Sequence, residues 1–88
     1  MTSYTIEFND GRTSDGCFDR DSDAQAWVEA VLEQHGCDAS EIVSGDWDAA
    51  GSNDDGSPLE RMLFWADEEA SNNDSGANAI CQLVRAAR

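Results

Sequence analysis

Apolar and polar residues alternate at the start of the chain. The segment 4–8 (YTIEF) has an apolar side chain at every second position, the period of a strand with one face in a core. Residues 9–11 (NDG) follow as a turn signal. Residues 12–18 are expected to return as a second strand with Cys17 or Phe18 facing inward. The pattern predicts a β-hairpin.

The following segment changes to a helical period. Apolar residues recur at spacings of three and four over residues 24–35, so that one stripe of the helix would face a core. Ser22 and Gln25 have the spacing of a capping box, which predicts a helix that begins near Ser22. Gly36 is expected to cap its C-terminal end.

The second half begins with a further pair of strands. Residues 42–47 have strand character up to Gly45. Residues 48–58 are rich in Asp, Asn, Gly and Ser and predict a loop that projects into solvent. Residues 61–66 (RMLFWA) are the most apolar segment and predict a central strand buried on both faces or nearly so.

A second helix is expected after the acidic, turn-rich residues 67–76. Asp74 or Ser75 can cap it, Arg85 and Arg88 suit its C-terminal end, and its apolar face would consist of Ala77, Ile80, Cys81 and Val84. The element order ββαββα predicts an α+β fold, a two-layer sandwich in which two helices cover one face of a four-stranded antiparallel sheet. We expect a single domain over residues 1–88, since no linker interrupts the chain.

Charge is the most unusual property of the sequence. Nineteen acidic residues stand against five arginines and no lysine, which gives a net charge of -14. Such a chain repels nucleic acid and anionic membrane surfaces, so direct binding to either is not expected. No apolar run approaches the ~20 residues that span a bilayer, and the three cysteines have no paired spacing, which predicts reduced thiols. These properties predict a cytoplasmic protein.

Residues that could support catalysis are scarce. The single histidine, His35, stands next but one to Cys37, so a Cys-His nucleophile pair is conceivable. A histidine at a helix end also complements the helix dipole, which explains His35 more simply. The two residues could supply two zinc ligands, but no second pair stands at zinc spacing. We therefore expect no enzyme activity, no catalytic residues and no cofactor.

Two acidic runs reproduce the opening spacing of a calcium-binding loop. They are Asp19-x-Asp21-x-Asp23 and Asp46-x-Asp48. Ala30 in the first run and Ser57 in the second occupy the position of the bidentate Glu that closes an EF-hand site. Helix capping and a solvated loop explain these runs better, and no metal site is expected.

Three groups of acids are candidates for binding a basic partner. They are Asp19, Asp21 and Asp23; then Asp46, Asp48, Asp54 and Asp55; then Asp67, Glu68 and Glu69. Arginines or lysines that line a groove could meet them through charge-assisted hydrogen bonds, although solvated loops are an equally good explanation for each group. Trp47 is the aromatic residue we expect to serve as an interface anchor, because Trp27 and Trp65 fall on core-facing patterns.

Mimicry of nucleic acid is physically sufficient to explain the charge. A sphere of this mass is roughly 30 Å across, and duplex DNA of that length carries about 18 phosphates, close to the 19 carboxylates of the chain. In size, acidity and lack of catalytic motifs, the chain resembles the small phage-encoded inhibitors of bacterial defence, particularly anti-CRISPR nucleic-acid mimics. The resemblance implies a non-enzymatic inhibitor in the host cytosol that occupies a basic groove of a nucleic-acid-binding complex, with a Cas effector subunit as its partner.

Salt adaptation is the alternative explanation. An Asp-rich, lysine-free surface is what a halophilic cytosol favours for any domain, and the absence of lysine fits this alternative better than it fits mimicry. The charge would then reflect habitat, and the chain would be a small binding or regulatory domain.

Overall fold

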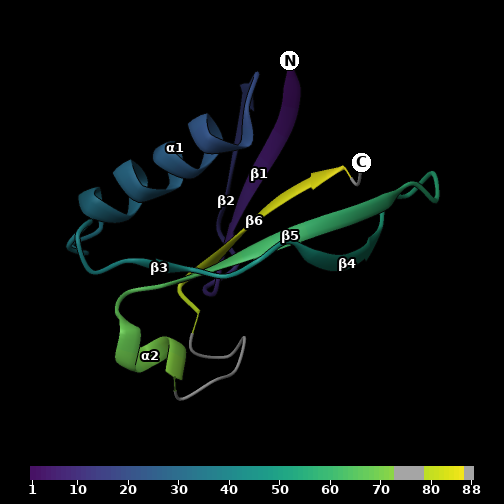
Figure 1. Cartoon of the computed structure of the whole chain (residues 1–88). Coiled ribbons are helices and arrows are strands. Elements are labelled where there is room, and N and C mark those ends of the chain that lie inside the picture. Colours follow the sequence, from purple (N-terminus) through teal and green to yellow (C-terminus); the bar gives the residue numbers. More distant parts are fainter. Residues whose placement is uncertain (73–78, 87–88) are drawn as a thin grey trace.

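The computed structural model describes residues 1–72 and 79–86. Within them the chain forms one antiparallel sheet of six strands and two helices (Figure 1). The elements in chain order are β1 (Thr2–Phe8), β2 (Thr13–Phe18), α1 (Asp21–Gln34), β3 (Val43–Ser44), β4 (Asp48–Ser52), β5 (Pro58–Trp65), α2 (Glu68–Asn72) and β6 (Cys81–Ala86). The strand order is β2-β1-β6-β5-β3, and β4 also pairs with β5.

The predicted first hairpin is confirmed. Phe8 N donates to Arg12 O at 2.8 Å and Gly11 N donates to Phe8 O at 3.0 Å, so the turn consists of the three residues between Phe8 and Arg12. Gly11 has φ +93°, the left-handed conformation that the bulge of such a turn requires. The turn fixes the β1–β2 register, in which Tyr4 lies opposite Gly16.

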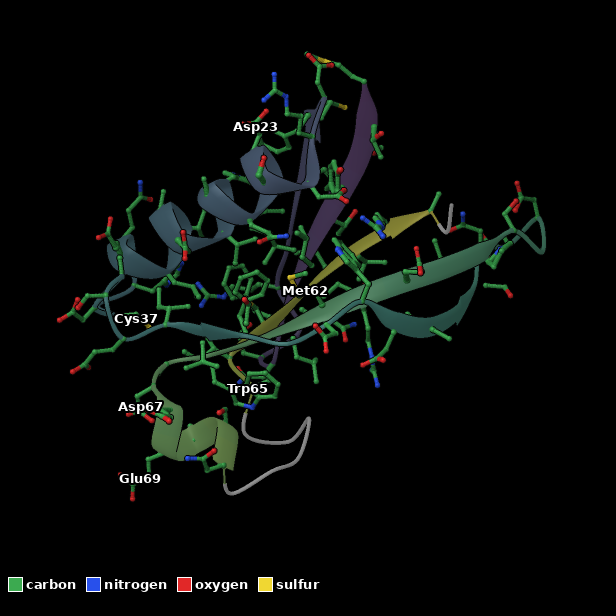
Figure 2. The ribbon with its side chains drawn as sticks, viewed as in Figure 1. Asp23, Cys37, Met62, Trp65, Asp67 and Glu69 are labelled. Carbon is green, nitrogen blue, oxygen red and sulfur yellow. The ribbon has the colours of Figure 1, made fainter. Side chains whose placement is uncertain are left out.

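Helix α1 covers one face of the sheet and closes the core. Ala24, Val28 and Leu32 repeat every four residues and are fully buried. They pack against the α1-facing side chains of the sheet, which are Tyr4, Ile6, Met62, Phe64, Cys81 and Leu83. Figure 2 shows Met62 in the layer between α1 and β5.

The sequence predicted the C-terminal end of α1 correctly but not the cap at its N-terminal end. Gly36 ends the helix as predicted: it has φ +96°, it donates to Glu33 O, and Cys37 N donates to Leu32 O. The predicted capping box is wrong, because the residue that precedes the helix is Arg20, which makes no side-chain cap. Asp21 instead turns toward the sheet, as described below.

The expected second helix is wrong over the described residues, where residues 81–86 form β6. This strand lies between β1 and β5, with Leu83 opposite Ile6 on one side and Met62 on the other. A central strand buries apolar side chains on both faces, so its pattern is not a simple alternation and can imitate helical spacing. Asp74, Ser75 and Ala77, expected at the start of that helix, and Arg88, expected at its end, lie outside the described residues.

The expected 48–58 loop is also partly wrong. Residues 48–52 form β4 against β5, with Asp48 opposite Arg61, and only the tip remains a turn. The residues of β4 have low strand propensity, and pairing with the strongly apolar β5 overrides it. The predicted central strand over residues 61–66 is confirmed by β5, and the strand over 42–47 is reduced to β3.

The predicted fold class is therefore wrong. The chain forms a six-stranded antiparallel sheet rather than a four-stranded one, and α2 is a single short turn at the end of β5 rather than a second covering helix. The face opposite α1 carries polar side chains: Arg61 donates to Gln82 at 3.3 Å and Gln82 donates to Glu7 at 3.1 Å. None of the described helices is long and apolar enough to cross a bilayer.

Candidate functional site: the acidic surface

Most of the carboxylates point into solvent with no cation beside them. Of the 18 acidic residues that the structure describes, 13 are exposed and five are half-buried. Ion pairs within the described residues involve only Asp10, Asp21 and Glu60. Negative charge is thus largely uncompensated at the surface.

The first candidate group is divided between surface and interior. Asp19 and Asp23 are exposed. Asp21 accepts a hydrogen bond from the Tyr4 hydroxyl at 2.5 Å and forms an ion pair with Arg85. Because Tyr4 and Arg85 are both buried, Asp21 attaches the start of α1 to the sheet, and only Asp19 and Asp23 remain for a partner.

Arg85 is the centre of a polar cluster that joins two of the candidate groups. Its side chain is 8% exposed and also binds Glu60 Oε1 from Nε at 3.3 Å and from Nη2 at 3.2 Å. Its guanidinium carbon lies 3.6 Å from the centre of the Trp47 ring, a cation–π contact. We call Tyr4, Asp21, Trp47, Glu60 and Arg85 the Arg85 cluster.

Electrostatics keep the Arg85 cluster charged. Burial acts to lower the pKa of the Arg85 guanidinium, but the hydrogen bonds that Arg85 donates to Asp21 and Glu60, together with the negative charges of these carboxylates, outweigh burial and raise this pKa above its usual value. Two carboxylates share one cation, so the cluster retains a net negative charge. It can therefore hold the fold together without neutralising the surface.

The second candidate group is spread along the β4–β5 hairpin. Trp47 is half-buried against the core and Arg85, which leaves Asp46 and Asp48 exposed on either side of it. Asp54 and Asp55 lie at the hairpin tip. The Asp55 carboxylate accepts a hydrogen bond from Ser57 N at 2.9 Å, and this bond holds the pKa of Asp55 below its usual value.

The third candidate group surrounds the start of α2. Asp67 Oδ1 accepts a hydrogen bond from Ala70 N at 2.8 Å and so caps this short helix. Glu68 and Glu69 are exposed. With Asp67 they line a shallow hollow of about 470 Å³, whose other walls are Ser40, Glu41, Ile42 and Val43.

The three groups do not meet on one face. The hairpin tip and α2 lie at opposite ends of β5, a strand of eight residues that spans about 26 Å (Figure 1). In Figure 2, Asp23 lies at the far end of the molecule from Asp67 and Glu69. The first group and the start of the second come together at the Arg85 cluster, and the third group is separate.

The residues considered for catalysis and metal binding lie elsewhere. His35 is exposed at the end of α1 with its ring 5.3 Å from that of Phe8, and Cys37 is half-buried against the core. Within residues 1–72 and 79–86, no group of three His, Cys, Asp or Glu side chains is arranged to hold a metal ion.

Sequence reasoning missed how Arg85 is used. It placed Arg85 at the C-terminal end of a helix, whereas Arg85 lies in β6, and it did not single out Glu60, which stands 25 residues away in the chain. The sequence did contain a signal. Arg85 stands between apolar residues, and a buried arginine needs carboxylates to pair with it, of which this chain has 19 against five arginines.

No protein-family model matches the chain, and comparisons with curated proteins and with solved structures gave no match. Function must therefore be inferred from the residues of this chain.

Proposed function

We propose that the chain is a non-enzymatic acidic binding protein that occupies a basic groove of a nucleic-acid-binding protein and thereby excludes nucleic acid. The observation that carries the proposal is the uncompensated, solvent-exposed charge described above. A Cas effector subunit of a bacterial defence complex is the partner to test first, in keeping with the resemblance to anti-CRISPR inhibitors.

The size of the molecule supports this proposal. Its longest extent is 36 Å, and duplex DNA of that length carries about 21 phosphates, against 19 carboxylates in the chain. A groove that holds a nucleic-acid backbone would therefore meet a similar density of negative charge.

The arrangement of the acids supports an elongated contact rather than a single pocket. Exposed carboxylates occur along the β4–β5 hairpin and on α2, which lie at opposite ends of β5, whereas those at the start of α1 lie away from this strand (Figure 1). Arginines and lysines spaced along a groove could meet them successively and speed association by electrostatic steering.

Competition with DNA tests the proposal directly. A guide-loaded Cas effector is bound to fluorescently labelled target DNA, and the acidic protein is added while anisotropy is followed. We expect displacement of the DNA, with an affinity for the effector that falls as salt is raised. Simultaneous binding of DNA and protein to the effector would contradict groove occupation.

A pair of charge variants locates the contact. Replacing Asp46, Asp48, Asp54 and Asp55 by asparagine removes four charges from the hairpin. The matched control removes four charges outside the three candidate groups, by substituting Asp10, Glu29, Glu33 and Asp38 with their amides. The hairpin variant should weaken binding by more than the control, whereas equal losses would indicate that only total charge matters.

The salt-adaptation alternative is tested by measuring whether the protein folds in dilute buffer, without any partner. A domain whose acids serve a halophilic cytosol should unfold without molar salt, because the carboxylates repel one another. We expect circular dichroism to show a folded protein in dilute buffer, since the Arg85 cluster and the core stabilise the sheet without bound cations. Unfolding in dilute buffer would favour the salt-adapted alternative.

A further inference from the structure

The two edges of the sheet are built differently. At one edge, β3 has two residues and the β4–β5 register shifts between Ala49 and Ser52, so that this edge is short and irregular. At the other edge, β2 pairs in an unbroken register with β1 and, within the described residues, with no other strand. Short strands and bulges discourage the addition of another strand, and β2 has neither.

The turn between β1 and β2 reveals which backbone groups of β2 face outward. Phe8 N donates to Arg12 O, so Phe8 and Arg12 form a hydrogen-bonded pair. Such pairs alternate along an antiparallel ladder, and the next ones are Ile6 with Ser14, Tyr4 with Gly16 and Thr2 with Phe18. The N–H and C=O groups of Thr13, Asp15 and Cys17 therefore point to the free edge.

The side chains along this edge differ on the two faces of the sheet. Thr13, Asp15 and Cys17 are exposed on the face opposite α1. On the α1 face, the half-buried rings of Phe18 and Trp27 lie 5.2 Å apart. One face thus offers a carboxylate and the other an aromatic surface.

We propose that the free edge of β2 binds an extended, basic segment of the partner, which adds to the sheet as a further strand. The inference rests on the proposed function, which supplies a basic partner. In this arrangement basic side chains lie beside Asp15, and the alternate apolar side chains lie beside Phe18 and Trp27. Asp19 directly follows β2 and is exposed, so a second carboxylate lies at the end of this edge.

Charge selects this occupant over a second copy of the chain. Two β2 strands paired about their centre would place Asp15 opposite Asp15, and like charges directly opposite each other destabilise a strand pair. Each copy would also carry a net charge of -14 into the contact. An extended basic segment has neither disadvantage.

Synthetic peptides test the inference. The probe is a peptide in which arginine and valine alternate, and its binding to the whole chain is measured by isothermal titration calorimetry. Two controls keep its charge and composition: one is N-methylated on the arginines and the other on the valines. N-methylation removes backbone donors from one edge of the peptide only, so strand addition should make the two controls differ.

We expect one N-methylated peptide to bind like the parent and the other to bind about tenfold or more weakly, because it cannot donate to the β2 edge. In the complex with the parent peptide, hydrogen exchange at the amides of Thr13, Asp15 and Cys17 should slow by about tenfold or more. On the protein side, Thr13→Pro with Cys17→Pro should weaken binding, while Thr13→Ala with Cys17→Ala should not.

Other outcomes would overturn the inference in distinguishable ways. Equal binding of all three peptides, with a strong salt dependence, would refute strand addition but leave acidic docking intact. Absence of binding by any peptide at low salt would count against both proposals. A dimer in sedimentation experiments that the proline variant abolishes would assign the edge to a second copy. The N-methylated peptides keep the test decisive even where the proline variant fails to fold.

Discussion

Replacing Arg85 by methionine removes the cation on which two carboxylates and an aromatic ring converge. Methionine keeps the apolar stem of the side chain, so the change isolates the guanidinium. Asp21 and Glu60 would lose the cation that they share, while their side chains are only 25% and 27% exposed to water. Trp47 would lose the cation stacked on its ring.

The loss of stability can be estimated from the burial of the ion pairs. Breaking a fully buried ion pair by removing one partner costs about 3–5 kcal/mol. The partial exposure of Asp21 and Glu60 allows water to compensate them in part, and we expect Arg85→Met to reduce the free energy of unfolding by about 2–4 kcal/mol. At about 4–8 °C per kcal/mol for a domain of this size, a loss of about 3 kcal/mol lowers the melting temperature by about 12–24 °C.

Urea unfolding followed by tryptophan fluorescence measures the effect at pH 7, with Arg61→Met as the matched control. Arg61 is exposed, so its replacement should change stability by less than about 0.5 kcal/mol. Adding Asp21→Asn and Glu60→Gln to Arg85→Met should recover part of the loss, because these changes remove the two negative charges that Arg85 compensated. The reasoning is refuted if Arg85→Met and Arg61→Met have the same stability.

Three further predictions concern single sites. Burial raises the pKa of the Cys81 thiol to about 12. Iodoacetamide at pH 8 should therefore alkylate the exposed Cys17 in the native protein and Cys81 only in urea, as measured by mass spectrometry of the peptides. Rapid alkylation of Cys81 in the native protein would contradict its burial. A Cβ on Gly16 would lie 2.9 Å from Phe18 Cε2 and 3.2 Å from Trp27 Cη2. Gly16→Ala should therefore lower the free energy of unfolding in urea by about 1–2 kcal/mol. An unchanged urea midpoint would show that the two rings move aside without cost. Hydrogen bonds from the Ser40 hydroxyl, the larger cause, and from the Ser40 N–H lower the pKa of Asp38. Asp38 therefore stabilises the folded state above its unfolded pKa and loses that contribution as pH falls through its folded pKa. In Ser40→Ala, NMR titration should show the pKa of Asp38 rising toward its usual value, and an unchanged pKa would exclude the hydroxyl as a cause.

Local patterns predicted the parts of the fold that local interactions determine. The β1–β2 hairpin follows from the alternation over residues 4–8 and the turn signal after it, and α1 follows from its apolar stripe and Gly36. Strand β5 was found because its apolar run is too short for a helix. In each case the segment carries enough information without its tertiary neighbours.

The remaining elements depend on neighbours that are distant in the chain. Strand β4 has a composition typical of a loop and is a strand only because β5 lies beside it. In β6, Leu83 and Val84 are adjacent and both buried, so no period-two alternation marked the strand. For the acidic surface, the sequence identified the exposed groups, but it could not distinguish Asp21 from Asp19 and Asp23, because the difference is a contact with Arg85 across 64 residues.

The position of β6 between β1 and β5 also governs how the chain can fold. Tyr4 pairs with Arg85, so the two strands at the middle of the sheet come from segments nearly the whole chain apart. During synthesis the β1–β2 hairpin and α1 emerge first, but their apolar faces have no complete partner until β6 has followed. Closing such long-range pairs before they are stabilised is slow. We expect the nascent chain to remain open until β6 inserts, and mutual repulsion among its carboxylates would keep it from aggregating during that interval.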